Sequence, residues 1–194
     1  RVLCTVPLPV LNRIQFTPSL SDEKIEAING GYNYAPSTRV FMQFANRFWE
    51  SEGLNGWGNT DWPEEIWHPT WDREGPKGIL MSYMYYGRAV ELDQLIEEDR
   101  IQHVLNRWDS VFPGVYDHVE NGISHSWALQ EWSGGAWASP TADQDEALAA
   151  HIGAAEGRIH FAGEHASDNH GWMQGALVSG LRAAMEIHTG DLYS

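Results

Sequence analysis

One stretch near the end of the chain, residues 157–189, constrains the fold more than any other. Its beginning, residues 158–162, reads as a short buried strand with Ile159 and Phe161 on one face. A Gly-Glu pair then opens a polar loop, and after Gly171 apolar residues recur at the three- and four-residue spacing of a helix. The stretch therefore predicts a strand, a loop and a helix whose N-terminus presents free amide groups to a ligand.

Two features of this stretch point to a ligand. Gly175, Ala176 and Gly180 leave one side of the expected helix nearly bare, so a neighbouring backbone or a flat ligand can approach closely. Glu164 in the loop carries an acceptor-only carboxylate, which suits ligand hydroxyls, such as those of a ribose or a ribityl chain, better than it suits phosphate. An ordinary strand–helix unit with a surface glutamate would show the same pattern, so both interpretations stand at this point.

The sequence GRIHFAGEH followed by HGWMQGALVSGLRAA closely resembles the C-terminal FAD signature of the flavin amine oxidases. Within that family it looks most like the L-amino-acid oxidase branch. The resemblance implies FAD as the cofactor, with Glu164 on its ribityl side, the pair Gly171-Trp172 beside the isoalloxazine ring at the substrate pocket, and Met173 at the flavin edge. The positions that it assigns to the cofactor are Val6, Trp127, Gly163, Glu164, Gly171, Trp172, Met173 and Ala176.

The start of the chain, RVLCTVPLPVL, reads as a strand that no turn or cap precedes. In the resembling family this is an internal strand, and the part upstream of it carries the dinucleotide-binding G-x-G-x-x-G turn, which does not occur after any strand here. We therefore expect the C-terminal portion of a larger two-domain flavoprotein, either a fragment or one chain of a processed enzyme. Its partner would carry the G-x-G-x-x-G motif, and we expect the assembled protomer to form a homo-oligomer.

The expected fold class is α+β. Residues 10–150 would form a substrate-binding domain with a mixed or antiparallel sheet flanked by helices, whereas the strand in residues 1–9 and the strand-loop-helix in residues 151–194 would belong to a Rossmann-like FAD domain. Within the middle part, the pattern predicts a helix capped by Ser21, extended segments, and two surface helices. Their expected ranges are 22–28 for the capped helix, 32–44, 78–83 and 123–127 for the extended segments, and 90–110 and 141–155 for the surface helices.

Three further positions carry chemistry that the resemblance implies. Arg39 stands where the family usually has a lysine that holds a water against flavin N5; arginine keeps the charge but presents a larger planar fork, and an exposed strand arginine is the alternative. Tyr83 falls where the L-amino-acid oxidases place a tyrosine whose hydroxyl binds the substrate carboxylate. A shift of one or two residues in the alignment would put Tyr85 or Tyr86 there instead.

Ala136, in the turn EWSGGAWASP, is small where some relatives have a larger group, which would leave room for a bulky substrate. The catalytic set implied by the resemblance is Arg39, Tyr83 and Trp172. The substrate-binding set is Tyr83, Ala136, Gly171 and Trp172.

The implied reaction is the oxidation of an L-amino acid. The α-hydrogen passes as hydride to flavin N5, water hydrolyses the resulting imine to a 2-oxo acid and ammonia, and O2 reoxidises the flavin to give hydrogen peroxide. The resemblance does not place the family's carboxylate-binding arginine in this chain, and we expect it in the upstream part. No residue here resembles an obligatory acid or base, so we expect the chain to be inactive without the upstream part. Two alternatives stay open: a monoamine or polyamine oxidase, which would need acidic pocket residues, and a non-enzymatic binding module.

Composition and motifs argue against several other classes of function. A formal net charge of −15 argues against nucleic acid or an anionic membrane as a partner, and the chain contains no run of 18 apolar residues. His160, His165 and His170 recur at five-residue intervals, a spacing that does not place metal ligands on one helical face, so we expect no metal site. No G-x-S-x-G hydrolase motif is present. The first residues do not resemble a signal peptide, and Cys4 alone does not decide the compartment; secretion with proteolytic maturation is a hypothesis.

Overall fold

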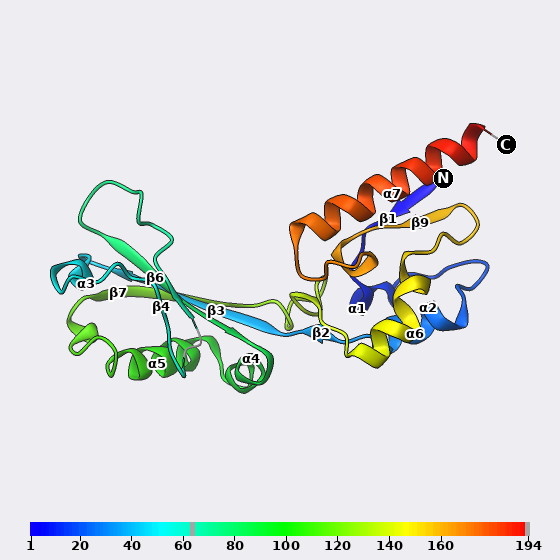
Figure 1. Ribbon diagram of the computed structural model, residues 1–194. Helices are drawn as coiled ribbons and strands as arrows, with labels where there is room; N and C mark the ends of the chain where they lie inside the picture. Colours follow the sequence, from blue (N-terminus) through cyan, green and yellow to red (C-terminus); the bar gives the residue numbers. More distant parts are fainter. Residues whose placement is uncertain (63–64, 193–194) are drawn as a thin grey trace. The chain divides into compact units, whose positions relative to one another are not determined.

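The computed structural model describes residues 1–62 and 65–192 (Figure 1). The chain divides into two compact units. The first unit contains both ends of the chain, residues 1–35 and the residues from 128 onward, and the second contains the middle, residues 36–127. Helices and antiparallel or short parallel sheets occur together, as expected for the α+β class.

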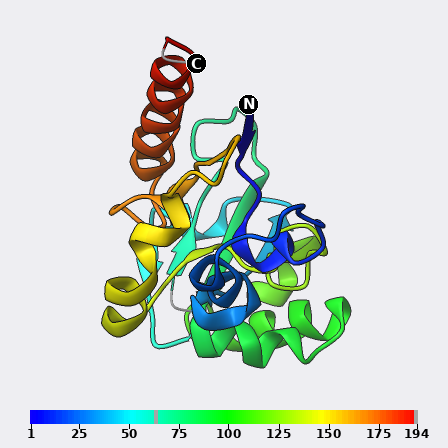
Figure 2. The same ribbon diagram turned by 90° about the vertical axis from the view of Figure 1, so that its right-hand side faces the viewer.

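The first unit contains a two-stranded parallel sheet made of β1 (Val2–Cys4) and β9 (Ile159–Phe161), with α7 (Met173–Leu192) lying over it (Figures 1 and 2). The two strands are far apart in the sequence, which a parallel pair requires because its strands need a crossover connection. Between β9 and α7 lies a loop with one short turn, η3 (Glu164–Ala166). The strand, loop and helix predicted from the sequence are therefore confirmed.

The rest of the first unit packs around one apolar core. Its other elements are α1 (Leu8–Leu11), α2 (Asp22–Glu26), η1 (Ala27–Gly31), β2 (Tyr34–Ala35), β8 (Trp137–Ala138) and α6 (Ala142–Gly153). The helix starts follow from their caps: the Ser21 side chain accepts the Lys24 N–H, and Thr141 forms a capping box with Gln144. β2 and β8 pair antiparallel.

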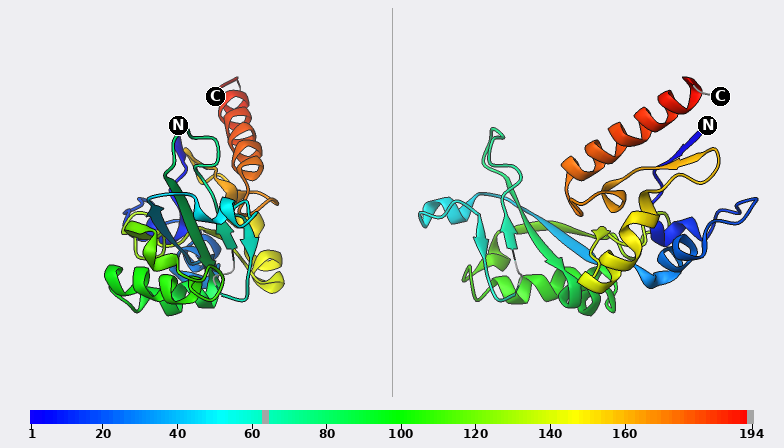
Figure 3. Two further views of the ribbon diagram at one scale, coloured as in Figure 1. Left: turned by 90° about the vertical axis from the view of Figure 1, so that its left-hand side faces the viewer. Right: turned by 45° about the vertical axis from the view of Figure 1, so that its right-hand side comes forward.

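The second unit is built on a five-stranded antiparallel sheet in the order β4-β5-β6-β3-β7 (Figure 3). Its central strands alternate between buried and half-buried side chains, because one face packs against helices. The core on that face includes Val40, Met42, Leu80 and Trp108. The elements are β3 (Ser37–Phe44), α3 (Phe48–Ser51), β4 (Gly58–Asn59), β5 (Glu65–Trp67), β6 (Gly78–Tyr85), α4 (Tyr86–Asp93), α5 (Glu97–Trp108), η2 (Val115–Asp117) and β7 (Val119–Ser126).

Two expected elements differ from the structure. The first strand ends at Cys4, and residues 8–11 form α1, because prolines at 7 and 9 lack N–H donors and suit the first turn of a helix. The single helix expected over 90–110 is two helices, since Ile96 is extended (φ −71°, ψ 165°) and three acidic residues then begin α5 favourably.

The compact units also differ from the expected boundaries. Residues 10–35 and 128–150, which we grouped with the substrate domain, share one core with β9, in which Leu11, Ile28, Leu148 and Phe161 are buried. Which unit serves the cofactor and which the substrate stays a prediction, and residues 193–194 of the predicted FAD segment lie outside the described residues. No helix within residues 1–62 and 65–192 has the length and apolar character needed to cross a membrane.

Candidate functional site

Glu164 is the centre of the loop between β9 and α7. One carboxylate oxygen accepts the backbone N–H of Ala138 at 2.9 Å, and the other accepts that of Gly171 at 2.6 Å. The backbone carbonyl of Glu164 accepts the Ser167 hydroxyl at 2.9 Å. Sequence reasoning assigned Glu164 to ligand hydroxyls, and that role stays a prediction, because each carboxylate oxygen has a second lone pair. The structure adds that Glu164 connects β8 with Gly171, which lies two residues before the start of α7.

Glycines shape the same loop. Gly163 has φ +144°, and a Cβ there would lie 2.4 Å from the His165 ring. Gly171 has φ +74°, and a Cβ there would touch the Trp137 ring at 3.1 Å. Gly175 allows the first turn of α7 to contact the loop, since a Cβ would lie 2.2 Å from the Asn169 carbonyl oxygen. The close backbone approach that we expected from small residues is therefore confirmed at Gly175.

A polar network that the sequence did not reveal holds the loop to α6. The Tyr32 hydroxyl donates to Asp145 at 2.6 Å, and His170 Nε2 lies 3.1 Å from the same carboxylate oxygen. His170 Nδ1 lies 3.2 Å from the Glu164 carbonyl, which can only accept, so this nitrogen carries a proton. The hydrogen bond from Tyr32 lowers the pKa of Asp145. No motif connects these residues, because Tyr32 and Asp145 are separated by 113 positions.

His165 is buried beside Gly163 and Tyr34. Loss of hydration, with a smaller effect of the nearby His170, lowers the pKa of its imidazole to about 4. The ring centroids of His165 and Tyr34 are 6.4 Å apart. His165 is therefore neutral near pH 7 and contributes packing to the loop.

The first unit contains four further predicted cofactor residues, and Ala136, which was predicted to bind the substrate. Trp172, directly before α7, and Met173, its first residue, are 68% and 85% exposed, and Ala176 is exposed one turn further on. Val6 is half-buried and packs on the core of this unit. Ala136 donates its N–H to the Ala35 carbonyl at 2.8 Å and lies directly before β8. The Glu164 carboxylate thus contacts the backbone near Ala136, at Ala138 in β8, and the backbone near Trp172, at Gly171.

The second unit brings Arg39 and Tyr83 together. They are cross-strand partners in β3 and β6, on the sheet face opposite the helices, and the guanidinium carbon lies 4.3 Å from the centre of the Tyr83 ring. The Arg39 Nε is buried and has no hydrogen-bond partner among the described residues. His125 is the cross-strand partner of Arg39 on its other side, in β7.

Aromatic side chains surround this pair. The ring centroids of Tyr83 lie 6.0 Å from Trp67 and 5.6 Å from Tyr85, and the His125 ring lies 4.6 Å from Trp127. Trp127, which we assigned to the flavin, is 39% exposed and donates its N–H to the Ser37 carbonyl. The alternation of strand residues predicts such a face, but the pairing of Arg39 with Tyr83 follows from a register between distant strands.

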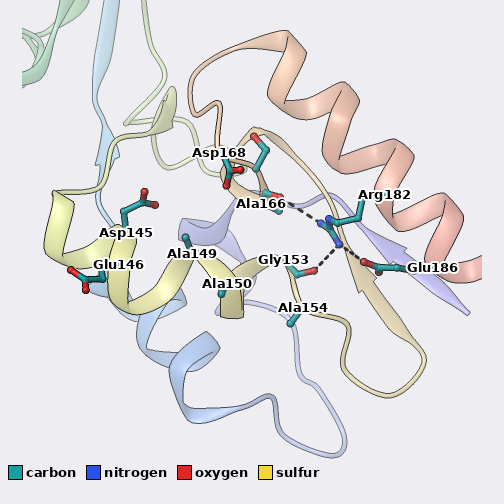
Figure 4. Close-up of a pocket in the computed structure, with 11 residues that line it drawn as sticks. Asp145, Glu146, Ala149, Ala150, Gly153, Ala154, Ala166, Asp168, Arg182 and Glu186 are labelled. Carbon is teal, nitrogen blue, oxygen red and sulfur yellow. Dashed lines mark hydrogen bonds and ion pairs between the residues drawn. The ribbon is translucent and has the colours of Figure 1, made fainter.

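A pocket of about 550 Å³ lies between α6, the loop after β9 and α7 (Figure 4). Its lining includes four acidic side chains and Arg182, whose guanidinium already donates to the carbonyls of Gly153 and Phe161 and to the Glu186 carboxylate. None of the predicted cofactor residues is part of the lining. Arg182 is the cation of this lining and is already paired with Glu186, so the pocket offers no unpaired cation to an anionic ligand. Across residues 1–62 and 65–192, no cluster of three or more His, Cys, Asp or Glu side chains is arranged to hold a metal ion.

Comparisons with known proteins identify the family to which the sequence is similar. The model of the family "Flavin containing amine oxidoreductase" matches residues 1–188. "Putative L-amino-acid oxidase YobN" of Bacillus subtilis is 35% identical, and the match covers 96% of this chain and 40% of that protein. "Flavin-dependent L-tryptophan oxidase RebO" of Lentzea aerocolonigenes is 31% identical, with 98% and 42% covered. The chain thus spans about two fifths of the length of these relatives.

Solved structures show the same fold. A triple mutant of putrescine oxidase superimposes with a TM-score of 0.86 at 22% identity, over 97% of this chain and 42% of that one. Cyclohexylamine oxidase from Brevibacterium oxydans gives a TM-score of 0.80 at 19% identity, over 99% and 43%. At these identities the likeness concerns the fold alone.

FAD is the cofactor that the family match supports. The residues of the first unit fit part of such a group: Trp172 and Met173 expose apolar surface at the start of a long helix, and Gly171 adds no side chain beside them. The chain lacks the glycine-rich turn that would hold a pyrophosphate. On the family match, the shared fold and this partial fit, the chain belongs to the flavin-containing amine oxidoreductase family.

Proposed function

We propose that this chain is the C-terminal part of an FAD-dependent L-amino-acid oxidase and works with an upstream polypeptide that carries the G-x-G-x-x-G motif. The overall reaction would convert an L-amino acid, water and O2 into a 2-oxo acid, ammonia and hydrogen peroxide. The names of the curated relatives support the amino-acid class, since several are L-amino-acid oxidases. The observation in this chain that carries the proposal is the Arg39–Tyr83 pair.

Arg39, for which the resemblance implied a role at flavin N5, has together with Tyr83 the chemistry of a carboxylate site, and we propose this second role for it. A buried N–H without a partner costs free energy, and a substrate carboxylate would satisfy the Arg39 Nε with a charge-assisted hydrogen bond. The Tyr83 hydroxyl can donate a second bond, while its ring fixes the guanidinium from one side. A substrate amine would instead be repelled by the arginine. This favours an amino acid over an amine.

The protein residues would bind the substrate and orient it. FAD, when bound, accepts the hydride from the substrate α-carbon. Arg39 and Tyr83 of the second unit would hold the carboxylate. The substrate-binding roles of Trp172 and Ala136, in the first unit, rest on the resemblance alone. The loop around Glu164 would keep Gly171 and Trp172 in position through its two backbone contacts.

The test uses protein that contains both this chain and the upstream part. Its ultraviolet–visible spectrum should show bound flavin, which L-amino acids bleach without oxygen, and hydrogen peroxide should form with L-amino acids and not with amines. Tyr83→Phe should raise KM for the amino acid about tenfold, the effect of one lost hydrogen bond to a charged group. Tyr116→Phe, which alters an exposed tyrosine of the same unit, is the control. Flavin-containing protein that oxidises only amines would contradict the proposal.

One observation favours an amine oxidase as the second candidate. Glu65 is the cross-strand partner of Tyr83 in β5, and its carboxylate accepts the Trp67 indole N–H at 2.6 Å. A carboxylate at that place could pair with a substrate ammonium group. Glu65→Gln distinguishes the two functions, because it should abolish amine oxidation but leave KM for an amino-acid carboxylate nearly unchanged.

A further inference from the structure

Four polar side chains form one row across the sheet of the second unit. Glu65 in β5 is the cross-strand partner of Tyr83 in β6. Tyr83 pairs in turn with Arg39 in β3, which pairs with His125 in β7. Directly paired residues place their side chains on the same face of a sheet, so all four lie on the face opposite the helices. The row therefore has a carboxylate at one end and a guanidinium two strands away.

Both charges of this row are available to a ligand. One oxygen of the Glu65 carboxylate accepts the Trp67 indole N–H at 2.6 Å, and no described residue pairs with the other oxygen. Arg39 forms no ion pair with any described residue, and its guanidinium lies over the Tyr83 ring. Two strand spacings, roughly 10 Å between Cα atoms, separate Glu65 from Arg39. A single ligand that pairs with both must therefore carry its two charges well apart.

The surface along the row between these charges is aromatic and open. The Tyr83 ring lies between Glu65 and Arg39 in the register, its centroid is 6.0 Å from that of Trp67, and the Trp67 ring lies 5.4 Å from Trp57. Trp67 is 37% exposed and Trp57 46%, so the described residues leave part of each ring uncovered. Aromatic rings can pack against methylene groups and stabilise a nearby cation. This surface therefore suits a carbon chain with opposite charges at its ends.

We propose that the substrate of this site is an L-amino acid with a cationic side chain, of the lysine type, and that Glu65 selects it. The inference rests on the proposed function, because it takes Arg39 and Tyr83 as the pair that binds the carboxylate. The α-ammonium group is attached to the carbon next to the carboxylate, so it lies too close to Arg39 to reach Glu65. An ammonium group at the end of a side chain reaches Glu65, which accepts a charge-assisted hydrogen bond from it. The methylene groups between then lie along Tyr83 and Trp67.

Three related compounds test the inference with protein that contains both this chain and the upstream part. L-lysine carries both charges, L-norleucine has the same carbon chain without the side-chain ammonium, and cadaverine is lysine without its carboxylate. We expect kcat/KM to be about tenfold higher for L-lysine than for L-norleucine, the effect of one hydrogen bond between charged groups. Equal kcat/KM for these two amino acids would overturn the inference and leave the proposed function intact. Oxidation of cadaverine alone would contradict the proposed function and the inference with it.

Variants of Glu65 assign the preference to this side chain. Glu65→Gln should lower kcat/KM for L-lysine about tenfold and leave that for L-norleucine unchanged, which also shows that the variant is folded. Glu98→Gln, at an exposed carboxylate of α5, is the matched control and should change neither value. Glu65→Lys should raise kcat/KM for L-2-aminoadipate, whose side chain ends in a carboxylate, and a misfolded protein could not show such a gain. A Glu65→Gln enzyme that keeps the full preference for L-lysine would overturn the inference.

Discussion

At the scale of single residues, Glu164 joins two segments through one carboxylate, and a small change isolates that role. Glu164→Gln keeps the size of the side chain but turns one acceptor into an NH2 donor facing a backbone N–H. We expect the free energy of unfolding to fall by roughly 1.5–3 kcal/mol. Urea unfolding measures it, with Glu146→Gln, an exposed carboxylate of the same unit, as the control. Equal stability of the two variants would show that the contacts contribute little.

His165 makes the first unit sensitive to acid. Its pKa is about 4 in the folded protein against 6.5 for a free imidazole, so between these values only the unfolded chain takes up a proton. Stability from this residue is complete above pH 6.5 and is lost as the pH falls toward 4, by roughly 3 kcal/mol in total. Urea unfolding from pH 8 to 4 should show a shallower decline for His165→Gln. Parallel curves for the two proteins would contradict the assignment.

The sequence predicts the residues of the site better than their contacts. Glu164, Gly171 and Trp172 belong to one continuous motif, so their neighbourhood could be predicted without a structure. The network of Tyr32, Asp145 and His170 could not, because three separate segments supply it. The same holds for the stacking of Arg39 on Tyr83, which depends on the pairing of two strands.

At the scale of elements, α7 offers a matched pair of glycines. Gly175→Ala would push a Cβ against the Asn169 carbonyl and the Ser167 hydroxyl, and we expect a loss of about 1–3 kcal/mol. Gly180→Ala meets no atom within 4 Å, so it should stabilise the helix by up to about 1 kcal/mol. Thermal unfolding of both variants measures the difference. A destabilising Gly180→Ala would mean that another segment covers this side of α7.

Elements were predicted where local signals are strong. Ser21 and Thr141 begin helices through their own side chains, and the strand before Gly163 is short, apolar and ended by a glycine. The break between α4 and α5 was missed because the apolar spacing continues through it, while the chain at Ile96 is extended. The spacing in α7 identified a helix, but it could not show that the large apolar residues are exposed.

At the scale of the whole molecule, the two units differ in how the chain builds them. The second is continuous in sequence, and its sheet places β3 between β6 and β7. The first draws its core from residues near both ends of the chain, such as Leu11 and Phe161. The sequence does not mark this division, because pairing between distant segments decides which residues share a core.

We therefore expect residues 36–127 to fold when expressed alone and residues 128–194 to remain unfolded alone. The first piece keeps its five-stranded sheet, α4, α5 and the core around Trp108 and Leu80, whereas the second loses β1, α1 and α2 and with them half of its core. Circular dichroism with thermal unfolding should show a cooperative transition for residues 36–127 only. Trp108→Ala should remove that transition, since the indole is fully buried and its loss costs roughly 3–5 kcal/mol. Trp71→Ala, at a side chain that is 66% exposed, should preserve it. A cooperative transition in residues 128–194 would mean that the terminal segments are dispensable for the first unit.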